Sequence, residues 1–208
     1  MKNFTTRKMF KKLVLGAWCL ALSLSPCYAS EDLTQIESYL NNIKNLSANF
    51  TQQSEAGTVA GKFYLARNSE SVKGEVGKMR VEYLAEPKIV IIVNGAVLSY
   101  YDVELDEISR LSTNTTPASF LTRPNISFAA KDIEVTKVTK ESGQISVSLV
   151  KKNRKDAGEF TLIFDLNPLR FVKMKVKNDL EQIVTVTLSD IDFKSEIPNK
   201  NFVIGSKK

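Results

Sequence analysis

The sequence contains no histidine, and its only two cysteines, Cys19 and Cys27, lie close to the amino terminus. Histidine is the commonest general base in enzymes, and cysteine serves both as a nucleophile and as a zinc ligand. A glycine-rich phosphate loop is also missing. The acidic run 102–107 is predicted to be a polar hairpin rather than a carboxylate pair for glycoside hydrolysis. We therefore expect no enzymatic activity, no metal site and no cofactor.

The amino-terminal segment has the three parts of an export signal. Five basic residues and no acidic ones precede an apolar run over residues 13–24, and small residues follow at Cys27 and Ala29. This pattern predicts a signal peptide over residues 1–29, cleaved after Ala29, and a single mature domain over residues 30–208. The apolar run is shorter than the about 20 residues of a membrane span. The mature protein is therefore expected beyond the inner membrane.

The net charge of the precursor says little about the mature chain. The precursor carries 29 basic and 23 acidic side chains, a net charge of +6. Removing the five basic residues of the predicted signal leaves 24 against 23, a net charge of +1. Nucleic-acid binding domains usually carry a basic patch of their own. We therefore expect no nucleic-acid partner.

A second interpretation of the amino terminus concerns Cys27. The run Leu24-Ser25-Pro26-Cys27 resembles the box at which bacterial lipoproteins are cut and acylated on cysteine. That box has a small residue before the cysteine, and Pro26 occupies this position instead. Acylation at Cys27 would produce an anchored protein, whereas cleavage after Ala29 would produce an unanchored one.

The mature region is predicted to be mainly β-structure. Apolar residues at helical spacing predict one helix over 31–46. A polar loop is predicted over 68–77, an Asn94-Gly95 turn after an apolar strand, and a short helix from Thr116-Pro117 that ends before Pro124. Residues of period two predict strands at 59–66, 79–84, 88–93, 97–102, 107–111, 132–139, 144–151, 159–165, 170–177 and 182–193. We expect one domain of about ten antiparallel strands.

Arg67 does not fit the alternation of its strand. It shares a face with Phe63 and Leu65, which should point inward, and a buried guanidinium is costly unless it is hydrogen-bonded. One interpretation is that the strand has ended and that Arg67 extends to solvent. The other is that Arg67 reaches into a concave interior and donates to backbone carbonyls of a covering segment, for which the helix after Thr116 is a candidate.

Several short motifs follow the first predicted helix and are densest over residues 46–123. They are Phe50-Thr51-Gln52, Gly61 to Arg67 as Gly-x-x-x-x-x-Arg, Met79 to Tyr83 followed by Pro87, Asn94-Gly95 before Tyr100-Tyr101-Asp102, and Thr116-Pro117 with Phe120 and Leu121. In their order, these motifs resemble the LolA family of periplasmic outer-membrane lipoprotein carriers. Two departures are Asn68 in place of the usual proline after the arginine, and a short carboxyl end after Ile204.

The resemblance implies an unclosed antiparallel β-barrel, a half-barrel, with helices as a lid over its concave apolar side. It implies a periplasmic monomer that takes acyl chains of lipoproteins from an inner-membrane ABC transporter and delivers them to an outer-membrane lipoprotein acceptor. Arg67 would bind carbonyls of the lid. The residues expected to bind lipid or the lid are Arg67, Phe63, Leu65, Met79, Val81, Tyr83, Phe120 and Leu121.

Two other functions share this fold. The first is an outer-membrane-anchored lipoprotein acceptor, similar to LolB, held by an acylated Cys27. The second is a regulatory domain that uses the same fold to bind a signalling protein. Fold alone does not distinguish these functions. The mass of the mature amino terminus separates the anchored acceptor from the carrier.

Overall fold

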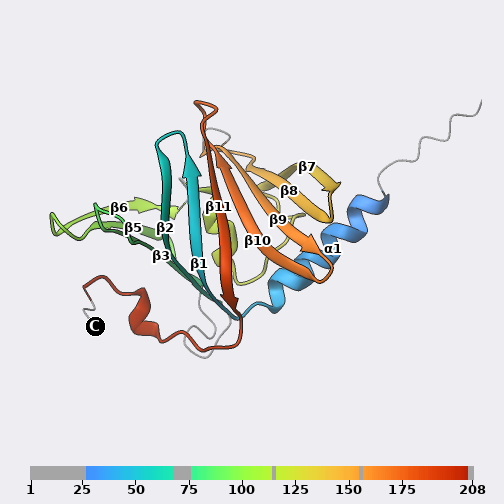
Figure 1. The fold of residues 1–208 in the computed structure, drawn as a ribbon. Helices are drawn as coiled ribbons and strands as arrows, with labels where there is room; N and C mark the ends of the chain where they lie inside the picture. The colour runs from blue at the N-terminus through green and yellow to red at the C-terminus, as the bar shows by residue number, and fades with distance from the viewer. Residues whose placement is uncertain (1–26, 68–75, 114–115, 155–156, 206–208) are drawn as a thin grey trace, which may run out of the picture.

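The computed structural model describes residues 27–67, 76–113, 116–154 and 157–205. Its centre is one antiparallel sheet of eleven strands in the order β6-β5-β4-β3-β2-β1-β11-β10-β9-β8-β7. The sheet curves strongly but does not close, so that β6 and β7 remain as edges (Figure 1). The strands are β1 Asn45–Ser54, β2 Gly57–Ala66, β3 Lys78–Tyr83, β4 Ile89–Asn94, β5 Val97–Asp102, β6 Glu107–Ser112, β7 Ile133–Glu141, β8 Gln144–Lys151, β9 Glu159–Leu166, β10 Leu169–Lys177 and β11 Ile183–Asp192. The predicted open half-barrel is confirmed.

The sheet consists of two meanders that meet at its middle. Strands β1 to β6 pair in chain order, as do β7 to β11. The last strand, β11, then pairs with β1, with Phe50 opposite Leu188 and Gln52 opposite Val186. This long-range pairing makes one continuous curved surface from both halves of the chain.

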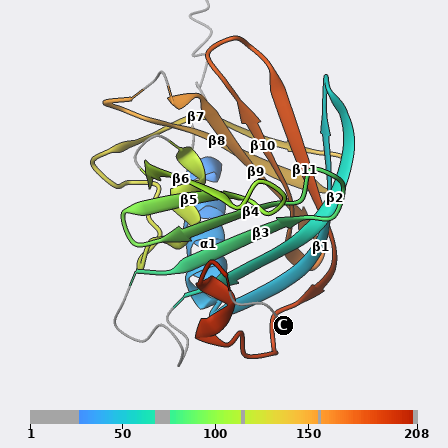
Figure 2. The same cartoon turned by 90° about the vertical axis from the view of Figure 1, so that its left-hand side faces the viewer.

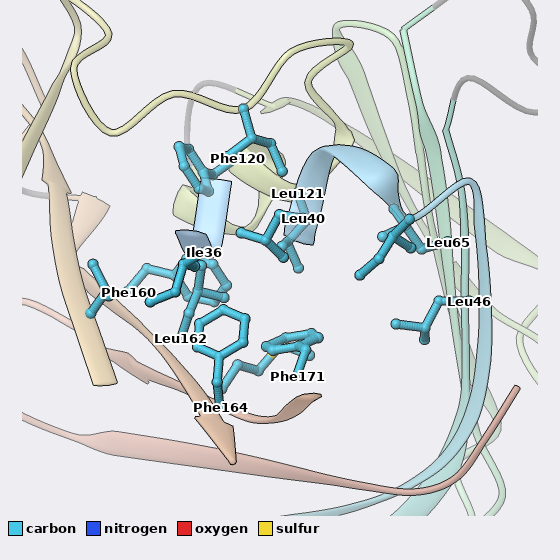
Figure 3. Close-up of a cluster of buried hydrophobic side chains, with 14 of the residues drawn as sticks. Ile36, Leu40, Leu46, Leu65, Phe120, Leu121, Phe160, Leu162, Phe164 and Phe171 are labelled. Atoms are coloured by element: carbon cyan, nitrogen blue, oxygen red, sulfur yellow. The ribbon is translucent and has the colours of Figure 1, made fainter. Parts of the chain in front are cut away.

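Two helical segments cover part of the concave face. They are α1 Cys27–Asn42 and the 3₁₀ helix η3 Pro117–Thr122. Ile36 and Leu40 of α1 are buried between the aromatic residues of β9 and β10 on one side and Leu46 and Leu65 of β1 and β2 on the other (Figure 3). This cluster is the main core of the domain, and the helices are in the place expected of a lid.

The structure corrects the predicted end of the first helix. Residues 31–46 were expected to be helical, but α1 ends at Asn42 and β1 begins at Asn45. The backbone N–H of Arg67 donates to the carbonyl of Lys44, which extends the pairing of β1 and β2 up to the helix. The additional strand β1 accounts for eleven strands instead of about ten.

The other local predictions on described residues agree with the structure. The helix after Thr116 is η3, which ends at Thr122 before Pro124, and the five strands of the second half lie where expected. The predicted loop over 68–77 lies largely outside the described residues, as does most of the predicted signal peptide. The predicted cleavage point after Ala29 falls within α1.

The carboxyl-terminal segment packs on the opposite, convex face of the sheet. Its 3₁₀ helix η5 Asn199–Phe202 lies across the outside of β3 and β4, while α1 lies behind the sheet (Figure 2). Ile197 and Phe202 form a small second core with Val90 and Ile92. The short carboxyl end therefore covers part of the outer surface and leaves the concave face to α1 and η3.

Candidate functional site

The concave face contains a hollow beside the covered core. Its volume is about 350 Å³, within the range of roughly 300–1,000 Å³ that small-molecule sites occupy. The wall comes from β1, β2, β3, β4, β5, β10 and β11, together with the residue just before η3. The lining residues are Phe50, Gln52, Phe63, Met79, Val81, Tyr83, Ile91, Leu98, Thr116, Met174, Val176, Val184 and Val186.

Short branched side chains line the hollow alongside bulkier residues such as Phe50, Phe63 and Tyr83. Strand alternation points Val81 of β3, Val176 of β10 and Val186 of β11 into the concave space. All three remain only partly buried. Branched aliphatic side chains of this size do not reach across a curved sheet, so the space between opposite walls stays open and apolar.

A pair of polar residues interrupts this apolar wall. The Tyr83 hydroxyl donates to Oε1 of Gln52 at 2.8 Å. The Tyr83 ring also meets the ring of Phe50 edge to face, with centroids 5.5 Å apart. These contacts cross β2 at Gly61, where a Cβ atom would lie 2.3 Å from the Phe50 ring. Burial raises the pKa of Tyr83 above 10.0, with a smaller contribution from Tyr100, so the phenol stays protonated at neutral pH.

Arg67 lies at the boundary between β2 and the covering helices, and only 1% of its surface is exposed. Its Nη2 donates to the carbonyl of Leu40 in the last turn of α1 and to that of Ile43 just after the helix, the latter at 3.4 Å. Its Nη1 donates to the carbonyl of Arg123, just after η3, at 3.4 Å. Burial lowers the pKa of Arg67 to about 10, so it remains charged at neutral pH. One guanidinium therefore holds both covering segments to the sheet.

The covering segments are also bound to each other. The Asn41 side chain of α1 donates to the carbonyl of Ile126 at 2.9 Å and accepts from its N–H at 2.8 Å. Glu37, one turn earlier, accepts from the hydroxyl of Ser127 and from the N–H of Phe128. Because these bonds join α1 to the chain after η3, the two elements form one cover. Arg67 binds this cover from the side of the sheet.

A second basic residue holds the start of η3. Lys151, at the end of β8, is buried, and its Nζ donates to the carbonyl of Thr113 at 3.3 Å and to Oγ of Ser119 at 3.2 Å. Ser119 in turn donates to the carbonyl of Thr116, a residue of the hollow wall. Lys151 therefore fixes the part of the cover that borders the hollow, opposite the end that Arg67 holds.

The predicted site residues divide between the hollow and the core. Phe63, Met79, Val81 and Tyr83 lie in the wall of the hollow. Leu65, Phe120 and Leu121 lie instead in the filled core with Ile36 and Leu40 of α1. The covering helix η3 itself carries Phe120 and Leu121 into this core. Arg67 borders the same core and contacts the cover.

The sequence interpretation missed several residues of the site. It placed Met174 and Val176 on one apolar face of their strand but did not assign that face to the hollow. Val184 and Val186 follow the same period of two. Lys151 gave no signal, since it lies among other basic residues in the sequence. Only the pairing of distant strands brings these side chains to the site.

The fold and the hollow define a class of protein: an open antiparallel half-barrel whose concave face is partly covered by helices and partly an accessible apolar hollow. The chain belongs to the family of the outer membrane lipoprotein carrier protein LolA, whose family model matches residues 41–205. This family consists of carriers, which bind and transport rather than catalyse.

Individual relatives are distant in sequence. The chain is 28% identical over 193 residues to the outer-membrane lipoprotein carrier protein of Coxiella burnetii, with 88% of this chain and 81% of that protein aligned. It is 27% identical over 186 residues to an uncharacterised protein of Rickettsia prowazekii, with 88% and 82% aligned. A solved structure of a DUF1329 family protein from Desulfovibrio piger has a TM-score of 0.50 at 10% identity, covering 86% of this chain and 98% of that one, which shows the shared fold.

Among the described helices, none is both long enough and apolar enough to cross a membrane.

Proposed function

We propose that the protein is a periplasmic carrier that binds the acyl chains of lipoproteins released from the inner membrane and delivers them to an outer-membrane acceptor. An inner-membrane ABC transporter would load it, and it would act as a monomer after loss of residues 1–29. The observation that carries the proposal is the open apolar hollow next to a cover held by Arg67. Membership in a family of lipoprotein carriers supports it.

The energetics of acyl transfer explain why such a hollow is needed. Each methylene group moved out of water is worth about 0.8 kcal/mol, so one sixteen-carbon chain is worth on the order of 12 kcal/mol. An unassisted acyl chain would therefore not leave a membrane for water. Apolar residues such as Val81, Met174 and Val186 supply a surface comparable to lipid. The same surface must not bind so strongly that the cargo is never released.

The hydrogen bonds of the cover would limit how tightly the hollow holds its cargo. The hollow borders the cover at Thr116, so a chain larger than the hollow would enlarge it by displacing the cover. Displacement would break the bonds from Arg67 to α1 and to Arg123. Each bond is worth roughly 1 kcal/mol net. Re-forming them on release would offset part of the apolar binding energy and favour transfer to the acceptor.

A transfer assay tests the proposal. Purified mature protein is incubated with spheroplasts that carry labelled lipoprotein, and the label in the soluble fraction is measured. We expect the wild-type protein to gain label. Val186→Trp, which fills the hollow, should gain at least tenfold less. Thr187→Trp, on the exposed outer side of the same strand, is the matched control and should behave as wild type. Label that stays with the spheroplasts in all three cases would overturn the proposal.

A further inference from the structure

The polar pair in the hollow has one hydrogen-bonding group left over. Gln52 lies in the wall, and its Oε1 accepts from the Tyr83 hydroxyl. In the described part of the chain, no acceptor pairs with the Nε2 amide group of Gln52. A side-chain amide has two N–H donors. The hollow therefore presents a neutral donor from a wall that is otherwise almost entirely apolar.

Tyr83 sets the direction of this donor. Its ring is held by the edge-to-face contact with Phe50, which the absence of a side chain at Gly61 permits. Its hydroxyl is protonated at neutral pH and donates to Oε1 of Gln52. Since the oxygen and the nitrogen of an amide lie on opposite sides of the same carbon, fixing the oxygen also fixes the nitrogen. Tyr83 is thus a positioning residue for the Gln52 amide.

The charge of the wall limits which ligand group can use the donor. A hydrocarbon chain accepts no hydrogen bond, so the donor has no role in binding the acyl tail itself. A carboxylate would need a cation to offset its burial, and none of the lining residues is basic. A neutral carbonyl oxygen meets both conditions, because it accepts from an amide N–H and carries no charge.

We propose that Gln52, oriented by Tyr83, binds the carbonyl oxygen of an ester- or amide-linked acyl chain. This inference rests on the proposed function and adds to it the chemical group by which the head of the chain is recognised. The hollow would then select esterified or amidated chains over plain hydrocarbons and over free fatty acids. It would also hold the chain in one register, with its carbonyl at Gln52.

The test uses two lipids that differ only in this group. Dihexanoyl glycerophosphocholine has two ester carbonyls, and dihexyl glycerophosphocholine has ether linkages in their place. Displacement of an apolar fluorescent probe from the mature protein measures the affinity for each lipid. We expect wild-type protein to bind the diester about fivefold more tightly, the net effect of one hydrogen bond. Gln52→Leu should bring the ratio close to one without weakening the diether.

Three further variants serve as controls for this test. Gln53→Leu, on the exposed side of the same strand, is the matched control and should keep the wild-type ratio. The double variant Gln52→Leu/Tyr83→Phe removes both partners, so it leaves no orphaned hydroxyl if Gln52→Leu alone folds poorly. Tyr83→Phe alone should reduce the ratio in part, because the amide is no longer oriented.

The outcomes separate the two proposals. If wild type binds both lipids equally, or if Gln52→Leu keeps the diester preference, the carbonyl site is wrong although the hollow binds lipid. If neither lipid displaces the probe from any variant, the carrier function is wrong and the carbonyl site with it. A diester preference that disappears only in the Gln52 variants establishes the site.

Discussion

The two halves of the concave face belong to the same sheet, but one half is buried under a helix and the other borders an open hollow. On the side of β8 to β10, Phe160, Phe164 and Phe171 are almost completely buried beneath α1 (Figure 3). On the side of β3 to β5, the shorter side chains of Val81 and Leu98 border open space. The difference shows that the curved sheet becomes a sealed core where α1 packs on it. Beyond that helix, the same alternation leaves an open hollow, although bulky residues such as Phe50, Phe63 and Tyr83 also line it.

The largest expected effect comes from removing matched leucines in the two halves. Leu162 is fully buried in the filled half, and its truncation to alanine should lower the free energy of unfolding by about 2–5 kcal/mol. Leu98→Ala, in the wall of the hollow, should cost about 1 kcal/mol, because that side chain already borders open space. Urea denaturation measures both. Equal losses would show that the two halves do not differ in packing.

The next effect concerns the boundary between the halves. Arg67→Leu removes the bonds to the cover and leaves the carbonyls of Leu40, Ile43 and Arg123 without this donor, so it should lower the free energy of unfolding by about 1–3 kcal/mol. We expect loaded protein to keep its lipid and to transfer it to acceptor several-fold more slowly than wild type. Arg110→Leu, on the exposed edge strand β6, is the control. Transfer at the wild-type rate by Arg67→Leu would refute the release role of Arg67.

A smaller effect is expected at the start of η3. Lys151→Met removes the bonds to Thr113 and Ser119 and should lower the free energy of unfolding by about 1 kcal/mol. It should also speed amide hydrogen exchange at Ser119, because the cover is held less tightly beside the hollow. Lys152→Met, the exposed neighbour, should leave both measurements unchanged. Unaltered exchange in Lys151→Met would mean that Lys151 does not hold the cover.

The smallest effect is a dependence on acid pH. Arg123 donates to Asp132 at 2.5 Å, and this hydrogen bond lowers the pKa of Asp132 below 3.8. A carboxyl group with a lowered pKa contributes stability that is fully present above pH 3.8 and is lost as the pH falls through the folded-state value. Asp132→Asn should therefore be less stable than wild type by under about 1 kcal/mol at neutral pH. A difference that stays constant into strong acid would contradict this assignment.

Local patterns in the sequence predicted most of the fold. Alternation with a period of two located the strands of the second half, and Thr116-Pro117 located η3. The predicted end of the first helix was wrong because Ile43 continued the helical spacing. Pairing of β1 with β2 and β11 decided that boundary instead. Pairing between strands that are far apart in the chain cannot be predicted from a short stretch of sequence.

The site was predictable only in part for the same reason. Strand parity and the family resemblance identified Phe63, Met79, Val81 and Tyr83, which line the hollow. The same reasoning grouped Phe120 and Leu121 with them, although η3 carries both into the filled core. Whether an inward side chain meets a covering helix or open space depends on where that helix packs. A sequence pattern predicts which face of the sheet a side chain points to, but not which element packs opposite that side chain.

The sequence by itself determined the class of structure, a mainly β chain, because that class depends on the periodicity and composition of the strands. It left two positions open for Arg67, at the surface or inside. The tertiary structure decided which part of the concave face is open. It also decided that Arg67 lies inside and binds both covering segments, and that Gln52 and Tyr83 form a hydrogen bond across Gly61. These features depend on distances between residues far apart in the chain. Such distances arise only when the two meanders pair and the helices pack against them.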